Sequence, residues 1–476
     1  MSARREVLRR STAALLAFST LLGWSTPARA LNPPTVYDNY QMVPLGSRAA
    51  GMGGAYTALA CDEGALHYNP ASLSCSDSSH LELSANAYVL QGLLVHGALG
   101  AGEDLTAVTY HSIPSIVGAV RVLSEGSART DVATYPKRFT FGFTVSIPAT
   151  LALKIDPARP DQRNHLAFAI RDDLTAGDLG FGYQINREVS VGVSVGAVLR
   201  STEQHASWLL VRGAGTPCGL GTCNDYLAYD DDRESYAAGA RAKLGVLVRP
   251  VHNFSFGLAL TTPTINIYGR AKESSTLARA DGMSFAAVPT RVEAKSEVGL
   301  PLRIALGAAY VRRRYTFSAD LSLNFPQHAR VIYDAKAQAI SGLGPPPILA
   351  DVVVARTFQP NLNLGAAIPF GPERELDIGL FTDLSSVPSA ASTGSGADRV
   401  HMFGGSMALG LLGKESRAWI GINGEIGSTI TRVPGRAFTY ERVAPLARGT
   451  LPDDGEATLV RWTLSGVLGS NYAFLE

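Results

Sequence analysis

Residues Val189–Arg200 read VSVGVSVGAVLR, and this stretch shows the pattern that decides the fold. Its odd-numbered positions are apolar, whereas its even-numbered positions are mainly serine and glycine. Side chains that alternate in this way lie on opposite faces of a β-strand. The pattern recurs in Arg138–Pro148 and Tyr315–Phe325, each 11 residues long. A tilted strand needs about 9–11 residues to cross a bilayer, whereas strands of soluble proteins are mostly about 5–6 residues long. The pattern therefore predicts membrane-crossing strands.

The connections between these runs alternate in length. Short turns join Ile185 to Val189, Val248 to Phe254, Val311 to Tyr315, Ile368 to Leu376, and Leu412 to Ala418. Long polar stretches separate the hairpins, at 148–176, 201–236, 263–299, 326–359, 385–400 and 428–457. Short turns on one side and long loops on the other are typical of outer-membrane barrels. We predict an all-β, transmembrane antiparallel β-barrel of about 14 strands: 80–90, 114–123, 138–148, 177–186, 188–200, 237–249, 254–262, 300–311, 315–325, 360–369, 376–384, 401–412, 417–427 and 458–474.

The composition agrees with this fold. Of 476 residues, 46% are hydrophobic and 17% are charged, yet no run of about 18 apolar residues lies in the body of the chain. A closed sheet crosses lipid without such a run, because only every second residue faces the lipid. A large soluble β-sandwich is the alternative. With 42 basic and 41 acidic residues, the chain lacks the basic surplus of a nucleic-acid-binding protein.

The N-terminus has the composition of a secretory signal peptide. Arg4, Arg5, Arg9 and Arg10 precede the apolar stretch Ser11–Trp24, and Ala28-Arg29-Ala30 resembles a cleavage site. Twin-arginine export is an alternative that the residues after Arg10 do not support. We predict that residues 1–30 are removed on export. The mature chain then carries 37 basic and 40 acidic residues, a net charge of −3.

Four cysteines lie in the exported part: Cys61, Cys75, Cys218 and Cys223. An even number in an oxidising compartment allows two disulfides with three possible connectivities. Pairing Cys61 with Cys75 and Cys218 with Cys223 closes the shortest loops and is preferred. Zinc is disfavoured, because no histidine or further cysteine has ligand spacing near either pair. No metal or cofactor is expected.

Residues 31–79 differ from the rest, because they are rich in small residues and lack the alternation. Their central part reads GSRAAGMGGAYTALACDEGALHYNPASLS from Gly46 to Ser74. This part resembles the N-terminal hatch of the FadL-type outer-membrane transport family, on Gly51-Met52-Gly53-Gly54, Asp62-Glu63 and the Asn69-Pro70-Ala71 motif. The resemblance implies a hatch at 31–79, a 14-stranded barrel at 80–476, and uptake of hydrophobic compounds such as long-chain fatty acids. It also implies exit of the substrate through a gap beside a kinked third strand, which is 138–148 here. The hatch residues it implies are Gly51, Gly53, Gly54, Asn69, Pro70 and Ala71.

Strand parity places a set of polar and charged side chains on the lumen face: Arg200, Arg241, Lys243, Arg303, Asp320, Asn324, Asp377, Asp383, Asn423 and Glu425. Their mixed signs favour ion pairs that hold the hatch. Phe381 and Trp419 share this face and are candidate contacts on the substrate path; packing against the hatch explains them equally well. The acidic stretch within 201–236 is either a solvated loop or a cation site, and solvation is the preferred interpretation.

Enzyme motifs do not fit. Gly192-Val193-Ser194-Val195-Gly196 matches G-x-S-x-G, but it lies inside an alternating run rather than at a strand–turn–helix junction. We therefore predict a non-enzymatic, monomeric outer-membrane channel for passive uptake of hydrophobic small molecules, surrounded by lipid and lipopolysaccharide. The first alternative is a structural or secretion-associated barrel that docks a partner protein. An outer-membrane lipase is a more distant one.

Overall fold

The computed structural model describes residues 39, 44–76, 78–96, 104–124, 138–155, 165–211, 216–218, 221–223, 226–251, 253–280, 285–331, 352–388, 399–413, 415–433 and 455–473. The predicted signal peptide, residues 1–30, lies outside this part of the chain. Three short helices come first: α2 (Ser47–Gly51), α3 (Ala65–Tyr68) and η1 (Pro70–Cys75). The described part then contains the strands β1 (His80–Val95), β2 (Leu105–Ser124), β3 (Phe139–Ile155), β4 (His165–Gln184), β5 (Val189–Val211), β6 (Thr216–Cys218), β7 (Gly221–Cys223), β8 (Tyr226–Val251), β9 (Phe254–Thr261), β10 (Ile265–Ala280), β11 (Phe285–Ala294), β12 (Arg303–Arg312), β13 (Tyr315–Asn324), β14 (Gln327–Val331), β15 (Val352–Arg356), β16 (Gln359–Pro369), β17 (Arg374–Asp383), β18 (His401–Leu412), β19 (Ser416–Val433) and β20 (Gly455–Ala473).

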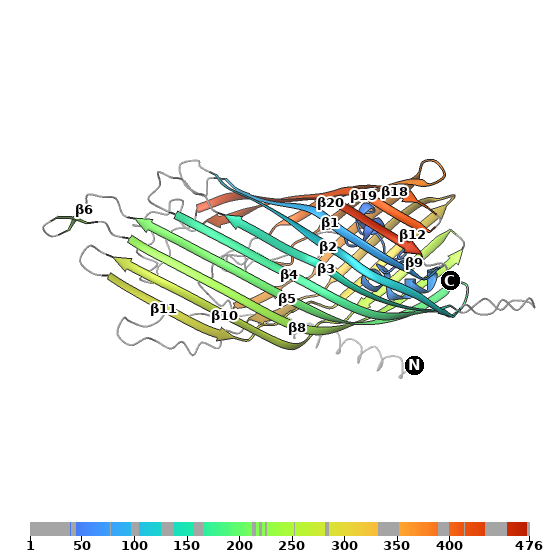
Figure 1. Cartoon of the computed structure of the whole chain (residues 1–476), viewed down its shortest axis with the longest axis horizontal. Helices are drawn as coiled ribbons and strands as arrows, with labels where there is room; N and C mark the ends of the chain where they lie inside the picture. The colour runs from blue at the N-terminus through green and yellow to red at the C-terminus, as the bar shows by residue number, and fades with distance from the viewer. Residues whose placement is uncertain are drawn as a thin grey trace, which may run out of the picture.

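Fourteen of these strands form a closed antiparallel barrel (Figure 1). Each strand pairs with its neighbours in the order β8-β5-β4-β3-β2-β1-β20-β19-β18-β17-β16-β13-β12-β9, and β9 pairs back with β8. The first and last strands meet along a seam that runs from His80↔Ala473 to Val95↔Leu459. All fourteen predicted strands are present in the predicted order, so the predicted fold class is confirmed.

Several strands are much longer than the sequence pattern predicts. β5 has 23 residues and β8 has 26. The predicted loop 201–236 is therefore wrong for most of its length, because Ser201–Val211 pairs with Tyr226–Tyr236. Stretch 263–299 likewise contains the hairpin of β10 and β11, which continues the sheet from the N-terminal half of β8. The reason is that alternating hydropathy marks a strand only where one face meets lipid. Where the outward face meets water, the pattern is lost but the ladder continues.

The wall of the barrel differs in height around its circumference. β12, β13 and β17 each have 10 residues, whereas β4, β5 and β8 have 20, 23 and 26. The long strands project from one side of the barrel, away from the end at which the chain terminates (Figure 1). That end also holds the short turns, because His80 pairs with Ala473 and Ser416 pairs with Tyr472 there.

The outward face of the barrel is apolar. In β13 the burial alternates strictly, with Phe317 51% exposed beside Ser318 at 6%. Valine, leucine, isoleucine and phenylalanine side chains occupy outward positions around the barrel, among them Val195, Leu244, Leu258, Leu306, Leu364, Leu380, Ile422 and Leu464. Such a belt is stable in contact with lipid, and the structure is that of a transmembrane barrel. Among the described residues, no helix has the length and apolar character needed to cross a membrane.

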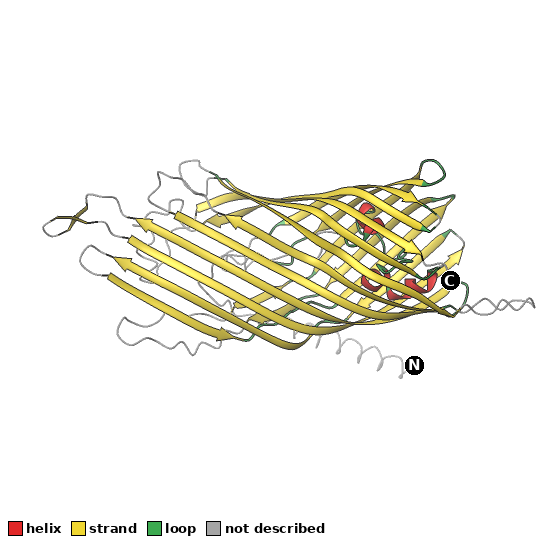
Figure 2. Cartoon of the chain, viewed as in Figure 1, coloured by secondary structure: helices red, strands yellow, loops and turns green. Residues whose placement is uncertain are grey.

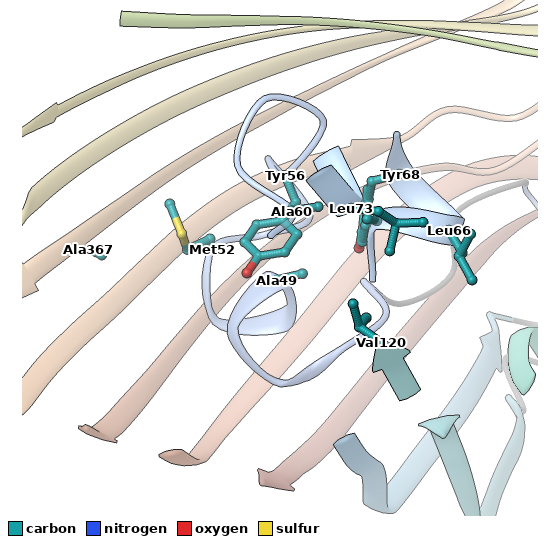
Figure 3. Close-up of a cluster of buried hydrophobic side chains, with 10 residues drawn as sticks. Ala49, Met52, Tyr56, Ala60, Leu66, Tyr68, Leu73, Val120 and Ala367 are labelled. Carbon is teal, nitrogen blue, oxygen red and sulfur yellow. The ribbon is translucent and has the colours of Figure 1, made fainter. Parts of the chain in front are cut away.

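Residues 44–76, called the inner segment below, lie within the barrel (Figure 2). The side chains of Met52, Tyr56, Leu66 and Leu73 are at most 3% exposed and form a small hydrophobic core (Figure 3). Val120 of β2 and Ala367 of β16 complete this core from the wall. Cys61 and Cys75 form a disulfide, as the shortest-loop pairing predicts. Cys218 and Cys223 are on β6 and β7, and their side chains lie outside the described part of the structure.

The lipid-facing belt gives a test of the fold. Val195 on β5 is 59% exposed on the outward face. We expect Val195→Arg to lower the free energy of unfolding in lipid vesicles by about 2–4 kcal/mol, because the charge must enter hydrocarbon. Chemical denaturation of the vesicle-inserted barrel measures this change. Val195→Leu is the matched control and should unfold at nearly the wild-type midpoint. Equal stability of the arginine variant would contradict a lipid-facing position.

Candidate functional site

The Asn69-Pro70-Ala71 motif fixes the inner segment to the wall. The side chain of Asn69 is fully buried, and its Oδ1 accepts a hydrogen bond from Ala71 N at 3.1 Å. This bond caps η1, and Pro70 follows at its first position, where no backbone N–H is needed. Asn69 Nδ2 donates to Thr57 O (3.0 Å) within the segment and to Val246 O (3.1 Å) of β8. One asparagine therefore caps a helix, closes the segment and attaches it to the barrel.

Glycines on the barrel wall make room for this motif. A Cβ atom at Gly192 of β5 would overlap the backbone of Pro70 and Ala71, and one at Gly245 of β8 would overlap Asn69 Oδ1. The two glycines pair with one another across the ladder. The small inward residues of the alternating runs thus allow backbone-to-backbone approach, a role that the sequence pattern alone does not specify.

The predicted hatch glycines lie on the opposite side of the segment. Gly53 and Gly54 have φ angles of +63° and +76°, which glycine adopts readily. Gly53 packs against the backbone of Gly379 and Leu380 in β17. Gly51 lies against Asp377 and Ala408, and its carbonyl accepts a hydrogen bond from Ser406 Oγ at 2.8 Å.

Charged side chains of the wall bind the backbone of the inner segment. Asp320 Oδ2 accepts hydrogen bonds from Tyr56 N at 2.8 Å and Thr57 N at 2.7 Å. Lys243 Nζ donates to the carbonyls of Leu66 and His67 at the C-terminal end of α3. Asp320 and Lys243 both belong to the lumen-facing set that parity predicts. They hold the segment through its peptide groups, whereas an ion pair joins Arg48 of the segment to Glu375 of β17 at 3.1 Å.

A lumenal pocket lies between the inner segment and the wall. Its basic lining residues are Arg200, Arg241, Lys243, Arg303 and Arg356, and no aspartate or glutamate is among the described residues that line it. The neighbouring carboxylates lie behind the lining, where Asp172 pairs with Arg200 and Asp178 pairs with Arg241. Apolar groups of Leu45, Leu174 and Leu300 line the same pocket. It therefore offers apolar surface and positive charge together.

His67 lines this pocket from the inner segment without adding to its charge. Burial lowers the pKa of His67 well below its ordinary value, and the cations of Lys243, Arg303 and Arg241 lower it further. The imidazole is thus neutral at physiological pH, and the positive charge of the pocket comes from the lysine and arginines of the strands.

The barrel ladder is interrupted beside this pocket. Pairing of β2 with β3 ends at Ile116↔Ser146, and the β3–β4 register shifts between Ser146 and Ala149. Pro148, which has no backbone N–H, lies at this shift. Beyond it, side chains replace the ladder: Gln91 of β1 accepts from Ala152 N (3.0 Å) and donates to Thr150 O (3.2 Å). Thr109 Oγ1 accepts from Lys154 N at 3.0 Å.

The pocket reaches this interruption, because Pro148 and Ala149 line it. The interruption lies beside the third strand, where the resemblance to FadL-type proteins places a gap. The proline at position 148 is the signal in the sequence that marks it.

The two predicted substrate-path aromatics lie elsewhere. Phe381 is 3% exposed and packs on Gly404 of β18, and Trp419 is 6% exposed and packs on Gly410. Neither side chain lines the pocket. Their role on a substrate path stays a prediction.

The acidic stretch of 201–236 lies on the projecting strands. His205 Nδ1 is 2.7 Å from Asp232 Oδ1 and 3.9 Å from Asp230 Oδ1, and all three side chains are at least 45% exposed. Exposed ion pairs of this kind contribute little to stability. These contacts agree with a solvated group of charges.

The chain was compared with known proteins. No protein-family model and no curated protein sequence matches it. Among solved structures, the toluene transporter TodX of Pseudomonas putida is 18% identical, with a TM-score of 0.59 over 92% of this chain and 100% of that one. A FadL homologue of Pseudomonas aeruginosa is 12% identical, with a TM-score of 0.62 over the same shares. The toluene transporter TbuX of Ralstonia pickettii is 14% identical, with a TM-score of 0.55 over 92% and 100%.

These similarities concern the fold. They define a transmembrane barrel of the class found in FadL-type hydrophobic-compound channels, and the resemblance predicted from Gly51–Ala71 is confirmed at that level. This chain shares that architecture over nearly its whole length.

The asparagine of the motif gives a second prediction. Asn69→Ala removes three hydrogen bonds, and we expect it to destabilise the inner segment by about 1–3 kcal/mol. Hydrogen–deuterium exchange of residues 61–75 should become faster while exchange of the barrel strands stays constant. Asn186→Ala is the control, because Asn186 Oδ1 also accepts two backbone N–H bonds, at the β4–β5 turn. If both variants leave exchange of residues 61–75 unchanged, Asn69 does not anchor the segment.

Proposed function

We propose that this protein is an outer-membrane channel for passive uptake of hydrophobic compounds, and that long-chain fatty acids are its substrates. The observation that carries the proposal is the lumenal pocket, which combines apolar side chains with five basic ones and borders the interrupted β2–β3 ladder. A fatty acid has matching chemistry, with a carboxylate at one end and a hydrocarbon chain along the rest.

In this mechanism the inner segment acts as a hatch. Its contacts extend from β3, β4, β5 and β8 on one side to β17, β18, β19 and β20 on the other, so direct passage toward the short-turn end is obstructed. A ligand in the pocket meets Pro148 and Ala149 instead, where β2 and β3 lack backbone pairing. The substrate then leaves sideways between these strands into the membrane. We assign residues 31–79 to the hatch and 80–476 to the barrel on this basis.

Two of the structural neighbours are toluene transporters, which supports uptake of apolar compounds. The basic pocket favours an acid over a neutral hydrocarbon as substrate, because a buried cation is stabilised by a carboxylate. The same pocket favours a transport function over the alternative function of a structural barrel that only docks a partner protein. Transport requires no catalytic group, and the G-x-S-x-G sequence lies within β5 rather than at a turn before a helix.

Closing the interruption should stop transport. Lys154 N and Thr109 Oγ1 are 3.0 Å apart, so these two residues are neighbours across the interruption and a pair of cysteines there can be tested for disulfide formation. We expect Thr109→Cys with Lys154→Cys to reduce uptake of labelled oleate under oxidising conditions and to regain it on reduction. The wild type, carried through the same oxidation and reduction, controls for the Cys61–Cys75 disulfide. Undiminished uptake by the fully cross-linked barrel would exclude this exit route.

The charge of the pocket should select the substrate. Arg303 lines the pocket, and Arg303→Gln removes one cation while keeping hydrogen-bonding groups. We expect oleate to bind about tenfold more weakly, the size expected for loss of one charge-assisted hydrogen bond, whereas toluene uptake should be unchanged. Arg417→Gln, at an exposed position of β19, should affect neither ligand. Equal losses for oleate and toluene would show that Arg303 supports the fold rather than recognises a carboxylate.

A further inference from the structure

Three carboxylates meet where the inner segment contacts β1. Asp62 and Glu63 belong to the inner segment, and Glu82 belongs to β1. One oxygen from each lies within 4.8 Å of the others. Glu63 is 0% exposed and Glu82 is 3% exposed. Carboxylates removed from water and placed this close together repel one another and lose their hydration, so the arrangement is stabilised by a cation or by protons among them.

Hydrogen bonds orient two of these carboxylates. Tyr56 Oη donates to Asp62 Oδ2 at 2.7 Å, and Glu82 Oε1 accepts from Ser47 N (3.2 Å) and Ser47 Oγ (2.6 Å). Asp62 Oδ1 and both oxygens of Glu63 are buried and receive no hydrogen bond. The guanidinium of Arg48, a nearby base on the inner segment, pairs with Glu375 at 3.1 Å on a different part of the wall. These hydrogen bonds thus orient one oxygen of Asp62 and one of Glu82. The other oxygen of Asp62 and both oxygens of Glu63 stay available to a cation.

A histidine on β1 faces the same point. His80 is 4% exposed, and its Nδ1 lies 3.0 Å from Ser78 O. A carbonyl oxygen accepts only, so Nδ1 carries the proton of this bond. Nε2 has no hydrogen-bond partner and lies 3.4 Å from Glu63 Oε2. With the proton on Nδ1, the lone pair of His80 Nε2 faces a lone pair of Glu63 Oε2 across this distance. A ring nitrogen fixed by a backbone carbonyl, with the other nitrogen directed at carboxylates, is the arrangement found for metal-binding histidines.

We propose that Glu63, Glu82, Asp62 and His80 bind a divalent transition-metal cation such as Zn²⁺ or Mn²⁺. Three oxygen ligands and one nitrogen suit these ions, whereas Ca²⁺ and Mg²⁺ prefer oxygen alone. Ligand atoms around a tetrahedral Zn²⁺ are about 3.3 Å apart, given bonds of about 2.0–2.2 Å. The His80–Glu63 distance of 3.4 Å agrees with this spacing.

The cation would connect the inner segment to the first strand. Two ligands, Asp62 and Glu63, lie inside the loop that the Cys61–Cys75 disulfide closes, and His80 and Glu82 follow it, so the metal and the disulfide lie next to each other in the chain. The composition of the chain does not predict this site. Two of its ligands lie in the predicted hatch, residues 31–79, and two lie in the predicted barrel, residues 80–476. The site is independent of the transported compound.

Zn²⁺ titration of the full-length folded barrel in detergent tests the site. After treatment with a chelator, the wild type should bind one Zn²⁺ by isothermal titration calorimetry at this site, and Zn²⁺ should raise its unfolding temperature. Glu63→Gln and Glu82→Gln should each weaken binding about 10–100-fold, the range seen when a group that supports a metal site is lost. Without metal both variants should fold at least as well as the wild type, because each removes a buried negative charge.

The exposed group of His205, Asp230 and Asp232 supplies the matched control, because it is the other described cluster with metal-ligand geometry. Asp232→Asn should leave the unfolding shift and the affinity of the inner site unchanged. Loss of Zn²⁺ binding in Asp232→Asn with retention in Glu63→Gln would overturn the proposal. Absence of Zn²⁺ and Mn²⁺ binding by the wild type would also overturn it, and would mean that protons rather than a metal ion neutralise the cluster. Both measurements omit the substrate, so their outcome is separate from that of the uptake experiments.

Discussion

Hydrogen bonding of every backbone group inside lipid is the constraint on which this structure depends. Fourteen strands meet it by closing on themselves, and the seam between β1 and β20 shows no free edge over fifteen paired positions. The interruption between β2 and β3 follows the same rule. Pro148 removes one donor, and the side chains of Gln91 and Thr109 bind backbone groups of β3 that the ladder leaves open. A local opening in the wall is therefore compatible with a membrane because side chains replace the missing backbone partners.

The lumen face follows from the same alternation. Outward positions are apolar, so the inward ones are free to be small or charged. Gly192 and Gly245 admit the backbone of the inner segment, while Asp320 and Lys243 bind its peptide groups. The inner segment is short of hydrophobic side chains, and wall residues order it by binding several of its backbone groups. The inner segment and the barrel therefore stabilise each other.

The sequence predicts the membrane part of the fold well, because each strand there carries its own signal of alternating hydropathy. It does not predict the projecting parts of β5 and β8, since hydropathy does not alternate along Ser201–Val211 or Tyr226–Tyr236 although the two stretches are paired. The Asn69 motif is found from its resemblance, but its bond to Val246 O depends on the register of β8. The cluster around Glu63 is missed for the same reason: its members become neighbours only when residue 63 folds back onto residues 80 and 82. Predicting it needs the path of the chain in space.

The position of the inner segment has a consequence for the order of assembly. The segment directly precedes β1 and touches strands from both ends of the sheet, β4 and β5 as well as β18 and β20. Once the seam between β1 and β20 is formed, no strand end remains through which 30-odd residues with a disulfide loop could be inserted. We therefore expect the segment to be in place before the last strand pairs, so that the sheet closes around it. The part of the molecule that obstructs the finished lumen would then also serve as the core on which the cylinder is completed.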